Sequence, residues 1–196
     1  MSVFHEKSVQ LHVATMEKIG AFTFRKMDEA GAREIVGWRY AAPYDLYNCN
    51  PDEIEDTVHW FVNPQSHYYS VWNESGEFIG YRCFEEDARV PGGDYRADAL
   101  DMGGGLRPTL TGRGLGASFL EAAFEFARQQ FRPIAFRATV AAFNQRALLV
   151  CERVGYRRIQ SFYKTATRQR FIVLMREADQ RHPAVPRLCN DNHHIF

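Results

Sequence analysis

A glycine-rich stretch at 106–117 carries the residues best suited to ligand chemistry in this chain. Three glycines, at every second position from 112 to 116, let the backbone approach a ligand closely and adopt positive φ without strain. An apolar pattern follows at once and continues to Phe131, which predicts a helix. Its first N–H groups and the positive end of its dipole would attract an anion, and Arg113 adds a guanidinium. The stretch therefore predicts a binding loop for the phosphates of a nucleotide or coenzyme.

Two common phosphate-binding motifs are absent from the chain. A nucleotide P-loop needs Gly-Lys-Ser/Thr, which occurs nowhere in the sequence. The dinucleotide motif GxGxxG fails because of the glycine spacing, and because no βαβ unit is predicted near the N-terminus. The chain has four scattered cysteines, none in CxxC spacing: Cys49, Cys83, Cys151 and Cys189. This spacing argues against a zinc site and against a disulfide framework, and it predicts a reducing, cytoplasmic setting. We therefore expect no metal.

A second motif lies downstream, with Asn-Gln-Arg-Ala at 144–147 followed by Cys-Glu-Arg-Val-Gly-Tyr at 151–156. It resembles the second signature of the GNAT family of N-acetyltransferases, N-x-x-A-x-x-x-Y-E-[KR]-x-G-[FY]. The upstream loop resembles that family's pyrophosphate loop, R/Q-x-x-G-x-G/A, with Pro108 at the family's usual proline position. One helix and one strand are predicted between the two signatures, as in the family. The resemblance covers about 97–165.

The resemblance implies direct transfer of the acetyl group from acetyl-CoA to a primary amine of a small molecule or peptide. It implies two parallel strands, at 97–107 and 134–141, that splay apart to admit the pantetheine arm. Gly-Gly-Gly at 103–105 would leave room there or form a plain bulge. A free backbone N–H near Leu106 would polarise the thioester carbonyl. The implied coenzyme-binding residues are Leu106, Arg107, Thr111, Gly112, Arg113, Gly114, Leu115, Gly116, Ala117 and Asn144.

Two positions depart from the family pattern. Thr111 replaces Arg or Gln at the start of the loop, and Cys151 replaces the tyrosine that usually acts as general acid. A thiol has an ordinary pKa of about 8.5, close to that of the departing thiol, so Cys151 is a candidate acid. It fits equally a small buried apolar residue in a helix stripe, which would leave the proton to Tyr156, Tyr163 or water. A non-catalytic acyl-CoA-binding or sensory domain is the alternative function.

Deprotonation of the amine needs a base or a water chain. Asp101 precedes the three glycines on the predicted strand, and the hypothesis is that it relays the proton. The acids at 85–87 fit a solvated turn. Aromatic side chains that could surround an acceptor amine are dense near Asp45: Trp38, Tyr40, Tyr44 and Tyr47. Packing in the core explains these aromatic residues equally well.

The elements around these motifs predict an α/β (α+β) fold. Alternation and turn signals predict strands at 21–27, 68–72, 78–83, 156–165 and 171–176, with helices at 29–38, 51–61 and 144–154. Together with the βαβ unit at 97–141 they predict a mixed, mostly antiparallel sheet with one central parallel pair, flanked by helices. A further strand is expected near Val9, Leu11 and Val13.

The length and charge of the chain limit its domain organisation and its partners. The 196 residues fit one domain at 19–178, with an N-terminal extension at 1–18 and a C-terminal tail at 179–196. The 24 basic and 24 acidic residues balance, so we expect no nucleic-acid partner. No apolar run is long enough to span a membrane, and the N-terminus lacks a signal-peptide pattern. The oligomeric state stays open, and a homodimer is compatible with the sequence.

Overall fold

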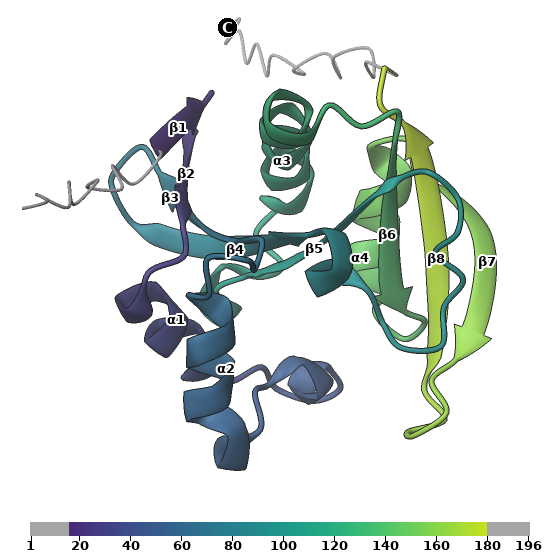
Figure 1. Cartoon of the computed structure of the whole chain (residues 1–196), viewed down its shortest axis with the longest axis horizontal. Coiled ribbons are helices and arrows are strands. Elements are labelled where there is room, and N and C mark those ends of the chain that lie inside the picture. Colours follow the sequence, from purple (N-terminus) through teal and green to yellow (C-terminus); the bar gives the residue numbers. More distant parts are fainter. Residues whose placement is uncertain (1–15, 180–196) are drawn as a thin grey trace, which may run out of the picture.

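The computed structural model describes residues 16–179, which form one mixed sheet with helices on both faces (Figure 1). The strand expected near Val9 and the chain beyond residue 179 lie outside the described residues. Strand order in the eight-stranded sheet is β1-β2-β3-β4-β5-β6-β8-β7. The strands are β1 Met16–Ile19, β2 Phe22–Lys26, β3 Tyr68–Asn73, β4 Phe78–Phe84, β5 Leu100–Leu106, β6 Ala135–Ala141, β7 Arg157–Tyr163 and β8 Arg170–Glu177.

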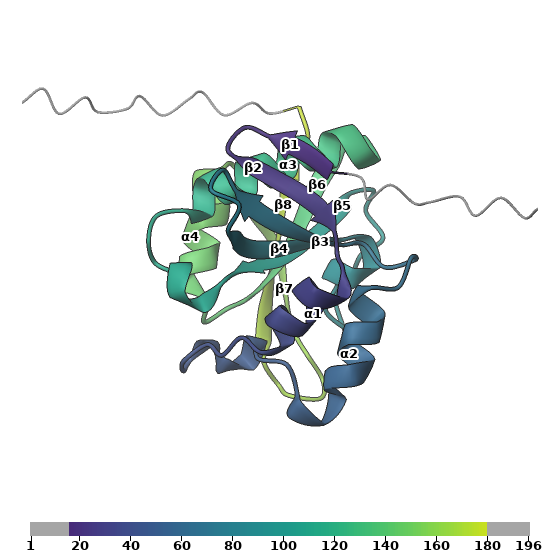
Figure 2. The same ribbon diagram turned by 90° about the vertical axis from the view of Figure 1, so that its left-hand side faces the viewer.

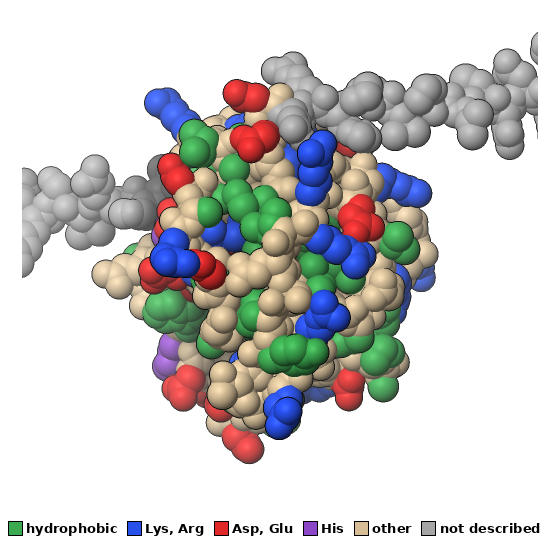
Figure 3. Space-filling model, turned by 90° about the vertical axis from the view of Figure 1, so that its right-hand side faces the viewer, with side chains coloured by type: hydrophobic (Ala, Val, Ile, Leu, Met, Phe, Trp, Pro, Cys, Tyr) green, Lys and Arg blue, Asp and Glu red, His purple; other side chains and the backbone are tan. Residues whose placement is uncertain are grey.

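Neighbouring strands are antiparallel throughout, except for the central β5–β6 pair, which is parallel. This confirms the predicted mixed sheet. β1 starts at Met16, so the sheet begins slightly before the predicted domain boundary at residue 19. β7 is an edge strand with mostly exposed side chains, among them Arg157 and Arg158. Figure 3 shows this side of the molecule, where basic side chains are interspersed with apolar ones. Charged residues of this kind discourage pairing of an edge strand with another chain.

Within residues 16–179, four α-helices cover the two faces of the sheet: α1 Glu29–Val36, α2 Ile54–Phe61, α3 Gly116–Phe131 and α4 Gln145–Arg153. Asp28 caps α1 as predicted, accepting a hydrogen bond of 2.8 Å from the N–H of Gly31. Helices α1 and α2 pack on one face, here called the α1 face (Figures 1 and 2). Helices α3 and α4 pack on the opposite α3 face, over a larger core that contains Phe124 and Phe136. A cavity that passes between strands could therefore be reached from both faces.

The sheet opens between β5 and β6. Only two residue pairs join these strands, Leu100 with Phe136 and Asp101 with Arg137. Beyond them β5 stays paired with β4 as far as Leu106, while β6 stays paired with β8 as far as Ala141. The two strands therefore form a V that opens toward their C-terminal ends, which is the splayed arrangement that the family resemblance implied.

Candidate active site

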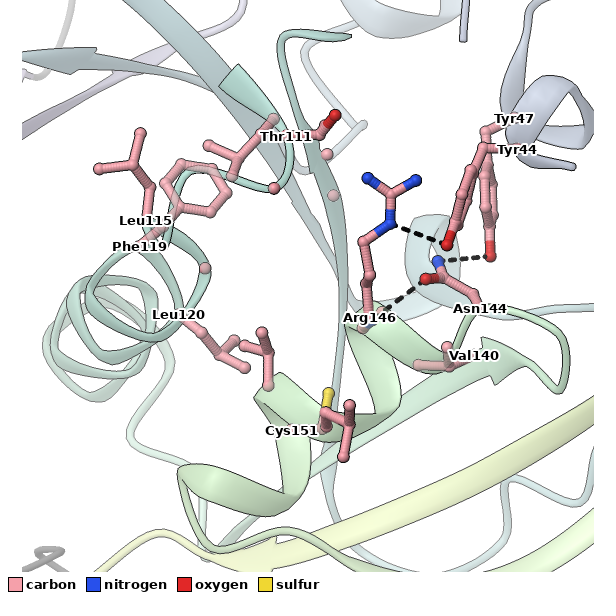
Figure 4. A pocket seen from close by; sticks show the side chains of 18 of the residues that line it. Tyr44, Tyr47, Thr111, Leu115, Phe119, Leu120, Val140, Asn144, Arg146 and Cys151 are labelled. Atoms are coloured by element: carbon pink, nitrogen blue, oxygen red, sulfur yellow. Dashed lines mark hydrogen bonds between the residues drawn. The ribbon is translucent and has the colours of Figure 1, made fainter. Parts of the chain in front are cut away.

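A cavity of about 1280 Å³ occupies the V between β5 and β6 (Figure 4). Its walls come from the open edge of β5, the glycine loop, the start of α3, the inner side of α4 and the segment after α1. It brings together most of the residues that the sequence predicted for a site: Leu106, Thr111, Gly112, Gly114, Leu115, Gly116, Ala117, Asn144 and Cys151.

The glycine loop forms the mouth of the cavity. Gly112 and Gly114 have φ of +76° and +81°, so both positions use the backbone freedom that glycine provides. The Thr111 hydroxyl donates to the carbonyl of Pro108 at 2.8 Å and holds the loop itself. The N-cap residue Leu115 offers α3 no side-chain hydrogen bond, so the first N–H groups of that helix are not taken up by a cap. A helix start of this kind suits the pyrophosphate of a coenzyme.

Gly116 fixes how closely α3 approaches α4. A Cβ at this position would lie 2.8 Å from Cγ2 of Val150, closer than real side chains approach. A side chain at residue 116 would therefore force a shift between the start of α3 and Val150 of α4.

The open edge of β5 presents backbone groups to the cavity. The N–H of Arg107 donates to the carbonyl of Ile79 at 2.8 Å and so points toward β4. Because successive residues of a strand point their N–H groups in opposite directions, the N–H of Leu106 points away from β4, toward the V. Consistent with this, the Leu106 carbonyl accepts a hydrogen bond of 2.7 Å from the hydroxyl of Tyr40. This direction is compatible with the oxyanion donor that the resemblance implies, and that role stays a prediction.

The three glycines of β5 are needed first for packing against β4. Gly104 has φ of +142°, and a Cβ there would lie 2.3 Å from the carbonyl oxygen of Tyr81. A Cβ on Gly103 would meet the sulfur of Cys83 at 2.7 Å. The glycines also line the cavity. They let β4 and β5 stay paired beside the opening.

Two tyrosines from the turn Tyr44–Tyr47 close one side of the cavity against the start of α4 (Figure 4). Arg146 donates from Nε to the Tyr44 hydroxyl at 2.8 Å and stacks on its ring, with 3.9 Å from guanidinium carbon to ring centroid. Asn144 donates to the Tyr47 hydroxyl at 3.1 Å, while its Oδ1 caps α4 by accepting from the Ala147 N–H at 3.0 Å. Asn144 thus has a structural role besides any contact with a coenzyme.

Arg146 is a site residue that the sequence reasoning missed, although it lies beside Asn144 in the second motif. Tyr40, Tyr44 and Tyr47 line the cavity as expected for the acceptor side. Trp38 instead lies in the core of the α1 face, with its ring centroid 5.6 Å from that of Phe78.

Three predicted site residues lie outside the cavity lining. Arg107 turns its guanidinium to Glu34 and Glu77 on the surface, and Arg113 is exposed. Asp101 sits at the closed end of the V, 2% exposed, beside a second cavity of about 640 Å³. Its carboxylate accepts from Arg137 at 2.6 and 2.8 Å and from Arg89 at 2.7 Å. The carboxylate is thus held in an ion pair outside the cavity lining, and the proton relay stays a prediction.

Cys151 lies on the inner side of α4 and is 6% exposed. Desolvation raises the pKa of its thiol to about 11, and the nearby charge of Arg82 only partly opposes this. Of the alternative acids, Tyr156 lines the cavity, with burial holding its pKa well above the ordinary value. Tyr163 is 65% exposed and does not line it. The thiol of Cys151 is thus a weaker acid than an ordinary thiol.

The raised pKa makes a prediction for the reactivity of Cys151. Alkylation by iodoacetamide requires the thiolate, so the reaction should be slow at neutral pH and accelerate only as the pH approaches about 11. Timed alkylation followed by peptide mass spectrometry measures this rate for the one residue. The same peptide in the denatured chain is the control and should react near the ordinary thiol pKa of about 8.5. Equal rates in the folded and denatured protein would contradict the buried environment.

The charged side chains around the cavity are mostly basic: Arg39, Arg82, Arg146 and Arg153. Glu152 is the only acidic residue that lines the cavity within residues 16–179, and it accepts a hydrogen bond of 2.6 Å from Arg158. The cavity therefore favours an anionic ligand. Within the same residues, no group of His, Cys, Asp and Glu is arranged to hold a metal ion, and no helix could cross a membrane.

Comparisons with known proteins agree with this geometry. Residues 32–156 match the model of the acetyltransferase (GNAT) family. A GNAT-family acetyltransferase from Bacillus anthracis superposes with a TM-score of 0.62 at 16% identity, over 85% of this chain and 100% of that one. A GNAT-family acetyltransferase from Bordetella pertussis gives 0.62 at 18% identity, over 83% and 99%. A variant of spermidine N-acetyltransferase from Vibrio cholerae gives 0.59 at 14% identity, over 81% and 94%. Curated protein sequences give no match.

Proposed function

Because the chain belongs to the acetyltransferase (GNAT) family, we propose that it transfers the acetyl group of acetyl-CoA directly to a primary amine of a small molecule or peptide. The observation that carries the proposal is the V between β5 and β6, with an uncapped helix start and a glycine loop at its mouth. The backbone groups of 112–117 and the basic walls fit the anionic coenzyme. The coenzyme supplies an activated acyl group.

Coenzyme binding and amine entry are assigned to opposite faces of the sheet. The glycine loop binds the pyrophosphate on the α3 face, and the Leu106 N–H donates to the thioester carbonyl. The amine enters on the α1 face, between Tyr40, Tyr44 and Tyr47. Among residues 16–179, Glu152 is the only acidic residue that lines the cavity, and its carboxylate already accepts a hydrogen bond from Arg158. We therefore propose that water removes the proton of the amine.

The charge of the cavity also limits which class of amine can be the acceptor. A polyamine would bring several positive charges into a cavity lined by four arginines and one paired glutamate. Like charges at short range repel strongly in a partly buried site. We therefore propose an acceptor with a single amine, such as an amino acid or a peptide N-terminus, rather than a polyamine like the substrate of the spermidine N-acetyltransferase from Vibrio cholerae.

One observation favours a second function. Cys151 stands at the position of the usual general acid, and its buried thiol has a pKa raised to about 11. A domain that has lost its acid could bind acyl-CoA as a sensor without turning it over.

A coupled assay separates the two functions. The enzyme should gain thermal stability with CoA and acetyl-CoA, and it should release free thiol from acetyl-CoA with at least one amine of a panel of amino acids, peptides, aminoglycosides and polyamines. ATP and NAD serve as controls and should leave the melting temperature unchanged. Stabilisation by CoA without thiol release for any amine would favour the sensor. Absence of stabilisation by CoA would remove both proposals.

A further inference from the structure

Arg82, in the middle of β4, is a buried cation with no acidic partner among residues 16–179. Its side chain lines the cavity and the residue is 8% exposed. Its guanidinium carbon lies 4.3 Å from the ring centroid of Phe119, and Nη1 is 3.5 Å from the Gly103 carbonyl. The buried Nε has no hydrogen-bond partner within the described chain. Within residues 16–179, Arg82 forms no ion pair. Burying a charge without a counter-charge is costly, so its position calls for an explanation.

The other two buried arginines differ from it. Arg137 is neutralised by Asp101 at 2.6 and 2.8 Å. Arg176 donates to the Val154 carbonyl at 2.7 Å and does not line the cavity. Among the buried arginines of the described chain, Arg82 alone turns an uncompensated charge toward the cavity.

Arg82 lies on the α3 face of the sheet. Tyr81, the preceding residue, packs on the α1 face against Trp38, and the alternation of the strand places Arg82 on the opposite side, against Phe119 of α3. The titratable groups that act on its charge are Cys151 and Tyr156 across the cavity, and Tyr81 and Cys83 on its own strand. All four are neutral below their raised pKa values, so none of them compensates the guanidinium.

The sulfur of the coenzyme would leave on this same face. In the proposed reaction the pyrophosphate binds at the start of α3, the Leu106 N–H holds the thioester carbonyl, and the amine approaches from the α1 face. The sulfur is joined to the coenzyme arm and therefore stays on the side of Arg82. Cys151 cannot readily protonate it, because its pKa of about 11 lies above the ordinary thiol pKa of about 8.5.

We propose that Arg82 stabilises the thiolate of coenzyme A as the acyl group leaves. The inference rests on the proposed function and assigns a catalytic residue within it. The C–N bond to the amine forms and the C–S bond breaks. The electron pair of the C–S bond remains on sulfur as a thiolate beside the guanidinium, and the proton of the amine passes to water. A fixed cation in a desolvated cavity thus replaces a proton donor.

The test compares the binding of CoA and desulfo-CoA, which lacks the thiol, by isothermal titration calorimetry. If Arg82 lowers the pKa of the bound thiol by about one unit, the affinity of CoA relative to that of desulfo-CoA should rise by about tenfold as the pH increases from about 6.5 to about 9. The sign follows because the thiolate binds more tightly than the thiol. Arg82→Met and Arg82→Gln should lose this gain, and Arg82→Lys should keep part of it.

Arg176→Met is the matched control, since it removes a buried arginine that contacts Phe124 outside the cavity. It should retain the gain. The ultraviolet absorbance of the thiolate in wild-type protein gives the pKa of bound CoA without any variant.

Three outcomes decide between the explanations. Failure of both ligands to bind wild-type protein would overturn the proposed function itself. Binding of both with the same pH dependence in wild type and Arg82→Met would overturn the role of Arg82 alone. A preference for succinyl-CoA over acetyl-CoA that disappears in Arg82→Met would assign the guanidinium to an acyl carboxylate instead and also overturn the proposal.

Discussion

Replacement of Asp101 by alanine is expected to lower the free energy of unfolding by about 3–5 kcal/mol, because it leaves buried arginine charge without a partner. Asp101 is 2% exposed and Arg137 1% exposed, and Arg137 bonds both carboxylate oxygens. Arg89 adds a third hydrogen bond of 2.7 Å. The pair lies at the last point where β5 and β6 meet, so its loss should also loosen the closed end of the V. Urea unfolding of the variant measures the effect.

Asp98→Ala is the control, since it makes the same change at an exposed position three residues away. Its effect should stay within about 0.5 kcal/mol. A loss below about 1 kcal/mol in Asp101→Ala would contradict a buried ion pair. Asp101→Asn tests the proton relay separately. Assayed well below its unfolding temperature, it should keep the pH profile of kcat/KM if the carboxylate is structural.

Gly116→Val is expected to weaken CoA binding by about 100-fold, on the scale that small misplacements of binding groups produce. A Cβ at residue 116 would lie 2.8 Å from Cγ2 of Val150, and the two methyl groups of valine add to this clash, so we expect α3 to move away from α4. The N–H groups of the helix start and the glycine loop would move with it. Titration calorimetry with CoA measures the loss, and circular dichroism checks that the variant folds.

Two further variants test whether the cause is steric. Ser118→Val places the same side chain at an exposed position of the same helical turn and should bind CoA normally. Gly116→Ala should weaken binding, and adding Val150→Ala should restore much of it by removing the atoms that the new Cβ meets. Full CoA affinity in Gly116→Val would show that the helix start does not form the pyrophosphate site.

Local patterns predicted the elements of this fold well. The cap at Asp28, the apolar helix that ends at Phe131 and the sheet with a central parallel pair all agree with the structure. These features depend on residues close in sequence, or on the general rule that a strand–helix–strand crossover makes parallel strands. The family assignment is confirmed as well, because it rests on two contiguous motifs.

Local patterns could not predict the partners of single charged side chains. Asp101 was assigned to chemistry because of its place before the glycines, yet the register of β5 against β6 puts it opposite Arg137. Arg107 was assigned to the coenzyme, but its partners Glu34 and Glu77 come from distant elements. No spacing in the sequence could have indicated these pairings.

The sequence by itself determined the glycine-loop side of the cavity: the glycine loop, the helix start behind it and Asn144 at the start of α4 are set by residues that are neighbours in the chain. The tertiary structure alone decided which charges meet the cavity. It paired Asp101 with Arg137 and Arg89, placed Tyr44 against Arg146, and buried Arg82 in the cavity wall with no acidic partner in the part of the chain that the structure describes. The physical reason is that an ion pair or an unpaired charge depends on strand register and helix packing, which join residues far apart in the sequence.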